Sequence, residues 1–289
     1  MTDVLTYPPS APRAADPVAQ EALLGRICVR PPYFALRHTG LEDGVFVATA
    51  EAELPRGRAL GPMRPGELSR HGAIAGLCAV ALRQRDDQRR YYLATDATFT
   101  GYPSPAPYGS SLQFRAAVSE LDKRSARAFV TAYAHEGRVA TLDVGYTVLP
   151  VTLFERLHAA RRQPTRPGAL EPLAIKDVVW RGDTGVYRIP ALPAAMCAGH
   201  FDNYPAAPVA LLMDQLAQIA ERFVDRPSYI ALGHIRATRL CWAGDEVVLS
   251  MTKLGGDPHE TRLEGRIVSG DALAGEMRLT LRHEPGASS

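Results

Sequence analysis

The sequence predicts an α+β fold in which two antiparallel sheets each curl around one long helix. Two observations lead to this prediction. One order of elements, a hairpin, a helix and then three or four strands, occurs twice along the 289 residues. Both predicted helices are apolar on nearly every side, so each must be buried, and an antiparallel sheet buries such a helix by wrapping around it.

The first copy of this order occupies residues 21–150. Residues 33–53 predict a hairpin with an Asp43-Gly44 turn. A helix is expected over residues 66–84, which read GELSRHGAIAGLCAVALRQ. The β-rich stretches that follow are residues 90–100, 111–121 and 125–150, the last interrupted by a turn at residues 135–137.

The second copy occupies residues 173–289. It begins with a hairpin over residues 175–189, turning at Gly182-Asp183, and continues with a helix over residues 207–223. The strands expected after it are residues 229–241, 246–253, 260–269 and 275–282.

Two further segments complete the predicted organisation. Residues 1–20 are rich in Pro and Ala and are expected to form a flexible arm. Residues 151–172 form a linker, with a short helix over 151–162 and a Pro-rich loop.

A single sheet wrapped around a helix leaves an open sheet edge, so two copies normally pair edge to edge. Here both copies are in one chain, which predicts a double hotdog fold.

Composition limits the classes of partner. The chain has 33 basic and 31 acidic residues, a formal net charge of +2, and no basic block of the kind that binds nucleic acid. Its four cysteines form no CxxC pair and have no histidine cluster beside them, so no metal site is expected. Without a signal segment or an apolar stretch long enough to cross a bilayer, we expect a cytoplasmic protein with no membrane partner.

One motif carries the chemistry. Residues 199–218 read GHFDNYPAAPVALLMDQLAQ and resemble the β-hydroxyacyl-acyl-carrier-protein dehydratases of fatty-acid and polyketide synthesis, a hotdog family. In that family a loop H-F-x-G-x-P-x-x-P-G leads into a helix whose acid lies fourteen positions after the His, with a Gln four residues later. The residues at matching positions are His200, Phe201, Pro205, Pro208, Asp214 and Gln218.

The match departs from the family pattern in two places. Asn203 and Val209 stand where the family has glycines. The first half shows a more eroded motif: when Pro65-Gly66 is set against the family's second proline and glycine, Gly57 replaces the loop histidine and His71 the acid.

The resemblance implies dehydration of 3-hydroxyacyl thioesters carried by an acyl carrier protein. His200 would be the base, and Asp214 the acid, because burial in an apolar helix raises a carboxyl pKa and keeps the proton on it. The backbone N–H of Val209, at the helix N-terminus, would bind the carbonyl, and Gln218 would orient the carboxyl. The other residues expected to bind or orient substrate are Tyr204 and His71. No cofactor is implied beyond the phosphopantetheine of the substrate.

The pairing of the two halves leaves three arrangements open. In the family the His loop of one unit faces the acid helix of the other, so within one chain His200 would meet His71, and Asp214 would face the loop near Gly57. In another arrangement, the second halves pair between two chains as a homodimer and restore His–Asp sites. Alternatively, His200 works with His71 and Glu67, or the chain is not a dehydratase.

Two other functions compete with dehydration. A thioesterase on the same scaffold would use an acid and a histidine to activate water against the thioester carbonyl. A non-catalytic acyl-binding or scaffolding subunit would account for the eroded first half. The sequence does not distinguish acyl-carrier-protein from acyl-CoA substrates and does not give the acyl chain, the pathway or the oligomeric state.

Overall fold

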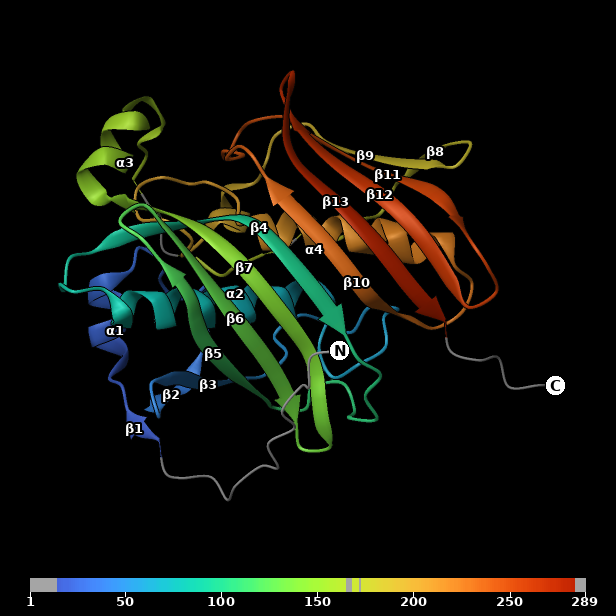
Figure 1. The fold of residues 1–289 in the computed structure, drawn as a ribbon. Helices are drawn as coiled ribbons and strands as arrows, with labels where there is room; N and C mark the ends of the chain where they lie inside the picture. Colours follow the sequence, from blue (N-terminus) through green and yellow to red (C-terminus); the bar gives the residue numbers. More distant parts are fainter. Residues whose placement is uncertain (1–14, 165–167, 172, 284–289) are drawn as a thin grey trace.

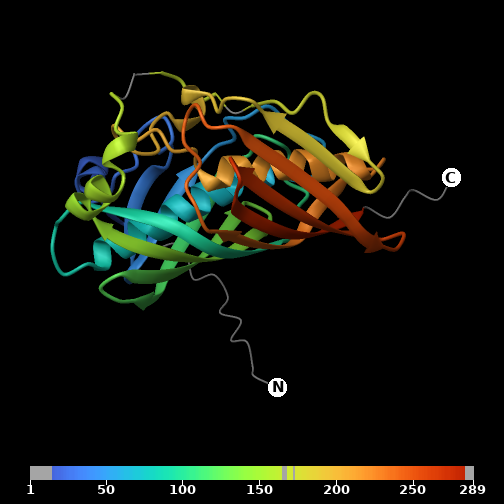
Figure 2. The ribbon, with the colours of Figure 1, turned by 90° about the horizontal axis from the view of Figure 1, so that it is seen from above.

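The computed structural model describes residues 15–164, 168–171 and 173–283. Its strands form one continuous curved sheet, and both long helices lie against the same face of it (Figures 1 and 2). Within the described residues this sheet has thirteen strands in the order β1-β2-β3-β5-β6-β7-β4-β10-β13-β12-β11-β9-β8. The predicted hotdog fold is confirmed.

The N-terminal hotdog surrounds helix α2 (Pro65–Arg83). The helix begins at a proline, which fits the first helical position because the N–H group that proline lacks would have no intrahelical acceptor there. Its residues are buried on all sides, including the charged Glu67 and Arg70. Its strands are β2 (Arg37–Glu42), β3 (Val45–Ala50), β4 (Arg90–Gly101), β5 (Leu112–Leu121), β6 (Ser125–Ala134) and β7 (Gly137–Pro150).

The C-terminal hotdog surrounds helix α4 (Val209–Ala220), which continues as the 3-10 turn η3 (Glu221–Phe223). The linker contains α3 (Val151–Leu157) and η1 (Ala159–Arg161). No helix in the described residues combines the length and apolar character needed to cross a bilayer. The remaining elements are η2 (Ala194–Cys197) and the strands β8 (Val179–Arg181), β9 (Thr184–Ile189), β10 (Ser228–Ala237), β11 (Val247–Gly256), β12 (Glu260–Ser269) and β13 (Ala272–His283).

Part of the segment expected to be a flexible arm has regular secondary structure. Strand β1 (Asp16–Pro17) pairs with β2, and helix α1 (Gln20–Arg26) begins at residue 20. The side chains of Leu23 and Ile27 are fully buried in the main core, and this burial orders the segment. Residues 1–14 of the arm lie outside the described residues.

The two hotdogs join through β4 and β10. These strands pair antiparallel from Thr100 opposite Leu232 to Asp96 opposite Arg236. Each strand would otherwise end its half-sheet with an open edge, so the pairing satisfies the backbone groups of both. The halves therefore pair within one chain, and the loop before α4 faces the first half.

Helices α2 and α4 are in close contact at Gly66. A Cβ atom on Gly66 would lie 2.2 Å from the Cβ of Asp214 and 2.7 Å from its Cα. No side-chain rotation removes a clash with backbone, so only glycine fits at this crossing.

We expect Gly66→Ala to destabilise the protein by at least about 2 kcal/mol, because the added methyl group pushes two packed helices apart. Gly25→Ala in α1 is the matched control, since nothing lies within 4 Å of its added Cβ. That change should be neutral or stabilise by up to about 1 kcal/mol through helix propensity. Urea unfolding midpoints measure both, and equal midpoints for the two variants would contradict the tight crossing.

Candidate functional site

His200 lies in the loop between η2 and α4, and Gly199 fixes the position of this loop. Gly199 has φ +74°, and a Cβ on it would lie 2.3 Å from the carbonyl oxygen of Arg30. The backbone N–H of Arg30 donates a hydrogen bond to the carbonyl of Gly199 at 2.7 Å. The histidine loop is thus held directly against the N-terminal half.

The imidazole of His200 is held in one tautomer. Its Nδ1 lies 2.8 Å from the carbonyl oxygen of Ala206. A carbonyl only accepts, so Nδ1 carries the proton and Nε2 is the acceptor. Burial lowers the pKa of His200 to about 4, which keeps the ring neutral at physiological pH. Phe201 stacks on the ring at 3.9 Å between centroids.

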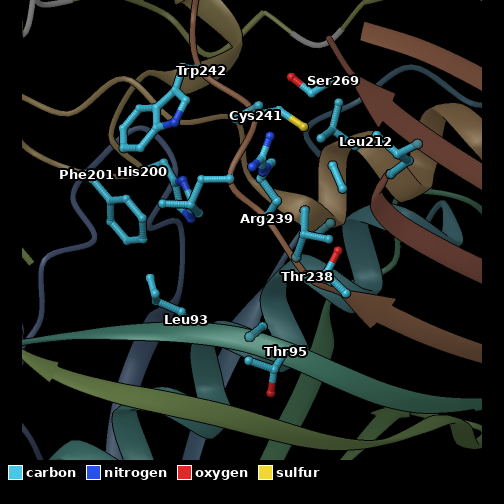
Figure 3. Close-up of a pocket in the computed structure, with 18 of the residues that line it drawn as sticks. Leu93, Thr95, His200, Phe201, Leu212, Thr238, Arg239, Cys241, Trp242 and Ser269 are labelled. Atoms are coloured by element: carbon cyan, nitrogen blue, oxygen red, sulfur yellow. The ribbon is translucent and has the colours of Figure 1, made fainter. Parts of the chain in front are cut away.

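His200 forms part of the wall of a cavity of about 930 Å³ (Figure 3). The cavity lies between α2, the start of α4, the middle of β4 and residues 237–242. The volume falls within the range of small-molecule sites. Its apolar walls include Ala73, Ile74, Leu77, Leu212, Ile267 and Ala274.

The N-terminus of α4 opens onto this cavity. Val209, the first residue of the helix, and Ala210 both line it. Pro208 precedes the helix, and no side chain caps it. The first N–H groups of a helix have no intrahelical acceptor, and the helix dipole favours negative charge near them. Val209 therefore lies where a carbonyl donor was expected.

Charged and aromatic residues surround the rim of the cavity. Arg161 of η1 pairs with Asp245 at 2.8 Å, and its guanidinium carbon lies 5.8 Å from the centroid of the Trp242 ring. The rings of His158 and Trp242 have centroids 5.1 Å apart. Arg239 is exposed and also lines the cavity. The linker thus forms part of the rim.

Asp214 lies outside the cavity. Its carboxylate forms an ion pair with Arg64 and accepts a hydrogen bond of 3.1 Å from the Gln218 side chain. Burial raises the pKa of Asp214 to about 6, with Arg64 acting in the opposite direction. Gln218 makes the expected contact, but the structure does not bring Asp214 to His200. Because its partner is an arginine, Asp214 is not the protonated carboxyl that was expected beside the imidazole of His200.

The loop near Gly57 faces a different acid from the one expected. Glu221 accepts a hydrogen bond of 3.1 Å from the backbone N–H of Arg58. A Cβ on Gly57 would lie 3.5 Å from a carboxylate oxygen of Glu221. The expectation that Asp214 faces this loop is therefore corrected: Arg64 holds Asp214 at the start of α2, and Glu221 reaches the loop.

His71 does not meet His200. It is fully buried, with its Nε2 3.9 Å from a carboxylate oxygen of Glu67 and 3.4 Å from an Nη of Arg70. Its ring lies against Phe114, on the side of α2 that faces β5. Burial lowers the pKa of His71. The expected pairing of His200 with His71 is therefore wrong, because helix rotation directs Ala73, Ile74 and Leu77 toward the cavity instead.

One cluster has the donor atoms of a metal site. Possible ligand atoms of Glu53, Glu67 and His71 lie within 4.8 Å of one another. The guanidinium of Arg70 pairs with Glu53 inside this cluster. Arg70 supplies a positive charge to Glu53, and the backbone N–H groups of Glu53 and Leu54 donate to the Glu67 carboxylate, so the arrangement fits a hydrogen-bonded ion-pair network better than a metal site.

Tyr204 belongs to the core rather than to the cavity wall. It is 2% exposed and packs in an aromatic cluster, where its ring meets that of Phe154 edge to face at 5.4 Å. Sequence reasoning missed Tyr33 and Arg64, which contact the predicted histidine and aspartate. Arg64 directly precedes the aligned Pro65-Gly66 dipeptide, which is the only sequence signal for it.

Comparisons with known proteins identify the fold alone. No protein-family model and no curated protein matches the sequence. The structure is similar to a proposed oleoyl thioesterase from Lactobacillus plantarum (TM-score 0.59, 12% identity, 83% of this chain and 97% of that chain). It is also similar to the 12:0-ACP thioesterase from Umbellularia californica (TM-score 0.57, 10% identity, 84% of this chain and 96% of that chain). A third similar structure is a tesB protein from Mycobacterium avium subsp. paratuberculosis (TM-score 0.56, 12% identity, 86% of this chain and 96% of that chain).

We expect the stability difference between wild type and Asp214→Asn to depend on pH. The folded pKa of about 6 lies above the unfolded value of 3.8, so the folded state binds this proton more tightly. Wild type should therefore gain about 2–3 kcal/mol relative to the variant as pH falls from about 7 to about 4.

Asp257→Asn is the control for this measurement. Backbone N–H groups lower the pKa of the exposed Asp257, so its difference from wild type should change in the opposite direction. Urea unfolding at several pH values measures both differences. A pH-independent difference for Asp214→Asn would contradict its raised pKa.

Proposed function

We propose that this chain is a hotdog acyl thioesterase that hydrolyses an acyl thioester bound in the cavity beside His200. One observation carries the proposal: the cavity brings a neutral imidazole to the N-terminus of a buried helix. Hydrolysis requires a base for water and donors for the oxyanion. His200 can act as the base, and the first N–H groups of α4 can act as the donors.

In the proposed reaction, Nε2 of His200 accepts a proton from water as the water oxygen bonds to the thioester carbonyl carbon. The carbonyl oxygen takes the negative charge and accepts a hydrogen bond from the N–H of Val209. This oxyanion stabilises the neighbouring imidazolium, because opposite charges attract strongly in an apolar site. The C–S bond then breaks, and the leaving thiolate takes the proton from His200. The products are a carboxylic acid and a thiol.

Dehydration would need an additional group. An acid must protonate the departing β-hydroxyl, and the predicted acid, Asp214, is paired with Arg64 outside the cavity. The α2 residues that face the cavity are Ala73, Ile74 and Leu77. Hydrolysis makes no such demand, so the geometry favours it over the dehydration that the sequence motif suggests.

The comparisons and the cavity walls support this choice. The three similar structures reported above include proteins named as thioesterases, and one is named for a 12:0-ACP substrate. The apolar walls formed by α2, α4 and β12 suit the hydrocarbon part of an acyl group. We infer an acyl-carrier-protein or acyl-CoA thioester as the substrate class.

Thiol release from acyl-CoA and acyl-carrier-protein thioesters of graded chain length tests the proposal. We expect wild type to release thiol and His200→Gln to lower kcat by at least about 10²-fold, because the base is lost. His234→Gln is the control, since this exposed histidine lies on β10, hydrogen-bonds Thr98 and does not line the cavity. Acyl binding without thiol release would indicate the non-catalytic alternative, and interconversion of 3-hydroxyacyl and enoyl thioesters would indicate dehydration.

The pH profile tests His200 separately. Because burial lowers its pKa to about 4 and the neutral ring is the base, kcat/KM should stay level from about pH 8 to about pH 5. It should fall to half near about pH 4. Enzyme held at the low pH and assayed near neutrality controls for unfolding. An inflection near the ordinary histidine value of about 6.5 would contradict the buried, neutral base.

A further inference from the structure

We propose that Tyr33 is a catalytic residue of this site, whose hydroxyl donates a hydrogen bond to the thioester carbonyl opposite His200. This inference rests on the proposed function and adds a group that the sequence motif does not contain. Tyr33 comes from the loop between α1 and β2, in the N-terminal half, whereas His200 and α4 belong to the C-terminal half. The site would thus be completed across the two hotdogs.

Direct backbone packing fixes the position of Tyr33 relative to His200. A Cβ on Gly199, the residue before His200, would lie 2.8 Å from the backbone nitrogen of Tyr33. The two rings then meet edge to face, with centroids 5.1 Å apart and an interplanar angle of 67°. Both rings line the same cavity. Neither residue can shift without displacing the other.

Three of the described tyrosines, Tyr33, Tyr92 and Tyr146, line the cavity, and the surroundings of their hydroxyls differ. Tyr146 donates its hydroxyl to the carbonyl of Ala73 at 2.7 Å. The hydroxyl of Tyr92 has no hydrogen-bond partner within the described residues, but it is fully enclosed, so a ligand in the cavity does not reach it. For Tyr33, no hydrogen-bond partner of the hydroxyl occurs within residues 15–164, 168–171 and 173–283. It is therefore a donor still available to a ligand in the cavity.

The environment of Tyr33 suits donation rather than proton transfer. Burial raises its pKa well above the ordinary tyrosine value, so the hydroxyl keeps its proton throughout the reaction. The guanidinium carbon of Arg70 lies 5.5 Å from the centroid of the Tyr33 ring. Arg70 is paired with Glu53, so its net effect on the phenol is small. As water attacks, the carbonyl oxygen would accept hydrogen bonds from Tyr33 and from the N–H of Val209, and no bond to Tyr33 breaks.

Steady-state kinetics of Tyr33→Phe tests the assignment. Removal of one oxyanion donor typically lowers kcat by about 10²–10³-fold, so we expect a loss of this size, with KM raised by no more than about tenfold through the weaker hydrogen bond to the ground-state carbonyl. Tyr146→Phe should retain at least about tenfold higher kcat than Tyr33→Phe, because its hydroxyl is already bonded to Ala73. Tyr108→Phe, outside the cavity, should keep wild-type kcat but lower Tm by about 2–4 °C through loss of its bond to Leu54.

Binding of two inert analogues separates this inference from the proposed function. S-(2-oxoalkyl)-coenzyme A keeps the carbonyl but lacks the scissile C–S bond, and Tyr33→Phe should bind it about tenfold more weakly than wild type does. S-alkyl-coenzyme A lacks the carbonyl and should bind both proteins equally.

The two ideas fail in different ways. Wild-type kcat and equal analogue binding in Tyr33→Phe, with His200→Gln inactive, would overturn the role of Tyr33 and leave the thioesterase proposal intact. Absence of thiol release by wild type would overturn both. A kcat loss that is matched by an equal loss of S-alkyl-coenzyme A binding would assign Tyr33 a purely structural role.

Discussion

The antiparallel pairing of β4 with β10 is the constraint on which the rest of the structure depends. It fuses two half-sheets at their open edges and thereby fixes which half each helix faces. The loop that carries His200 is pressed against the segment that carries Tyr33, and the start of α2 is pressed against Asp214. In an unpaired hotdog neither contact would exist, so the contents of the cavity follow from this strand register.

Desolvation then decides how the two buried ionisable groups behave. His200 lies among aromatic and apolar groups. The neutral form of its ring therefore has the lowest free energy, with one ring nitrogen bonded to the carbonyl of Ala206. Asp214 is more fully enclosed than His200, and it is paired with Arg64. A buried carboxylate needs such a partner, and a carboxylate so engaged is poorly suited to hand a proton to a substrate. Burial alone therefore does not identify a catalytic acid.

Much of the fold follows from periodicity. Strand β12 occupies the residues 260–269 that alternation predicts, and α2 differs from its predicted range by one residue at each end. Helix α1 was missed because its seven residues are too few to show a helical repeat within an Ala- and Pro-rich region. Its order comes from tertiary burial of Leu23, which no local pattern encodes.

The candidate site was less predictable than the fold, because it depends on contacts between distant residues. The motif spacing located His200 and the N-terminus of α4 correctly in the chain. It gave no sign that Asp214 would bond to an arginine 150 positions away. It also placed His71 by alignment alone, whereas the rotation of α2 about its axis decides which side chains enter the cavity. Tyr33 belongs to no motif, and only the packing of Gly199 brings it to His200.

The two ends of the contact between α2 and α4 differ in how closely they are packed. Where α4 begins, small α2 side chains such as Ala73 leave room for the large cavity. Where α2 begins, Gly66 lets the helices touch, and Met213 and Phe99 fill the space to a cavity of about 20 Å³. A substrate entering there would have to separate two close-packed helices and expose the Arg64–Asp214 pair. The duplicated scaffold thus leaves a cavity at one end of the α2–α4 contact and close packing at the other, and His200 lies at the open end.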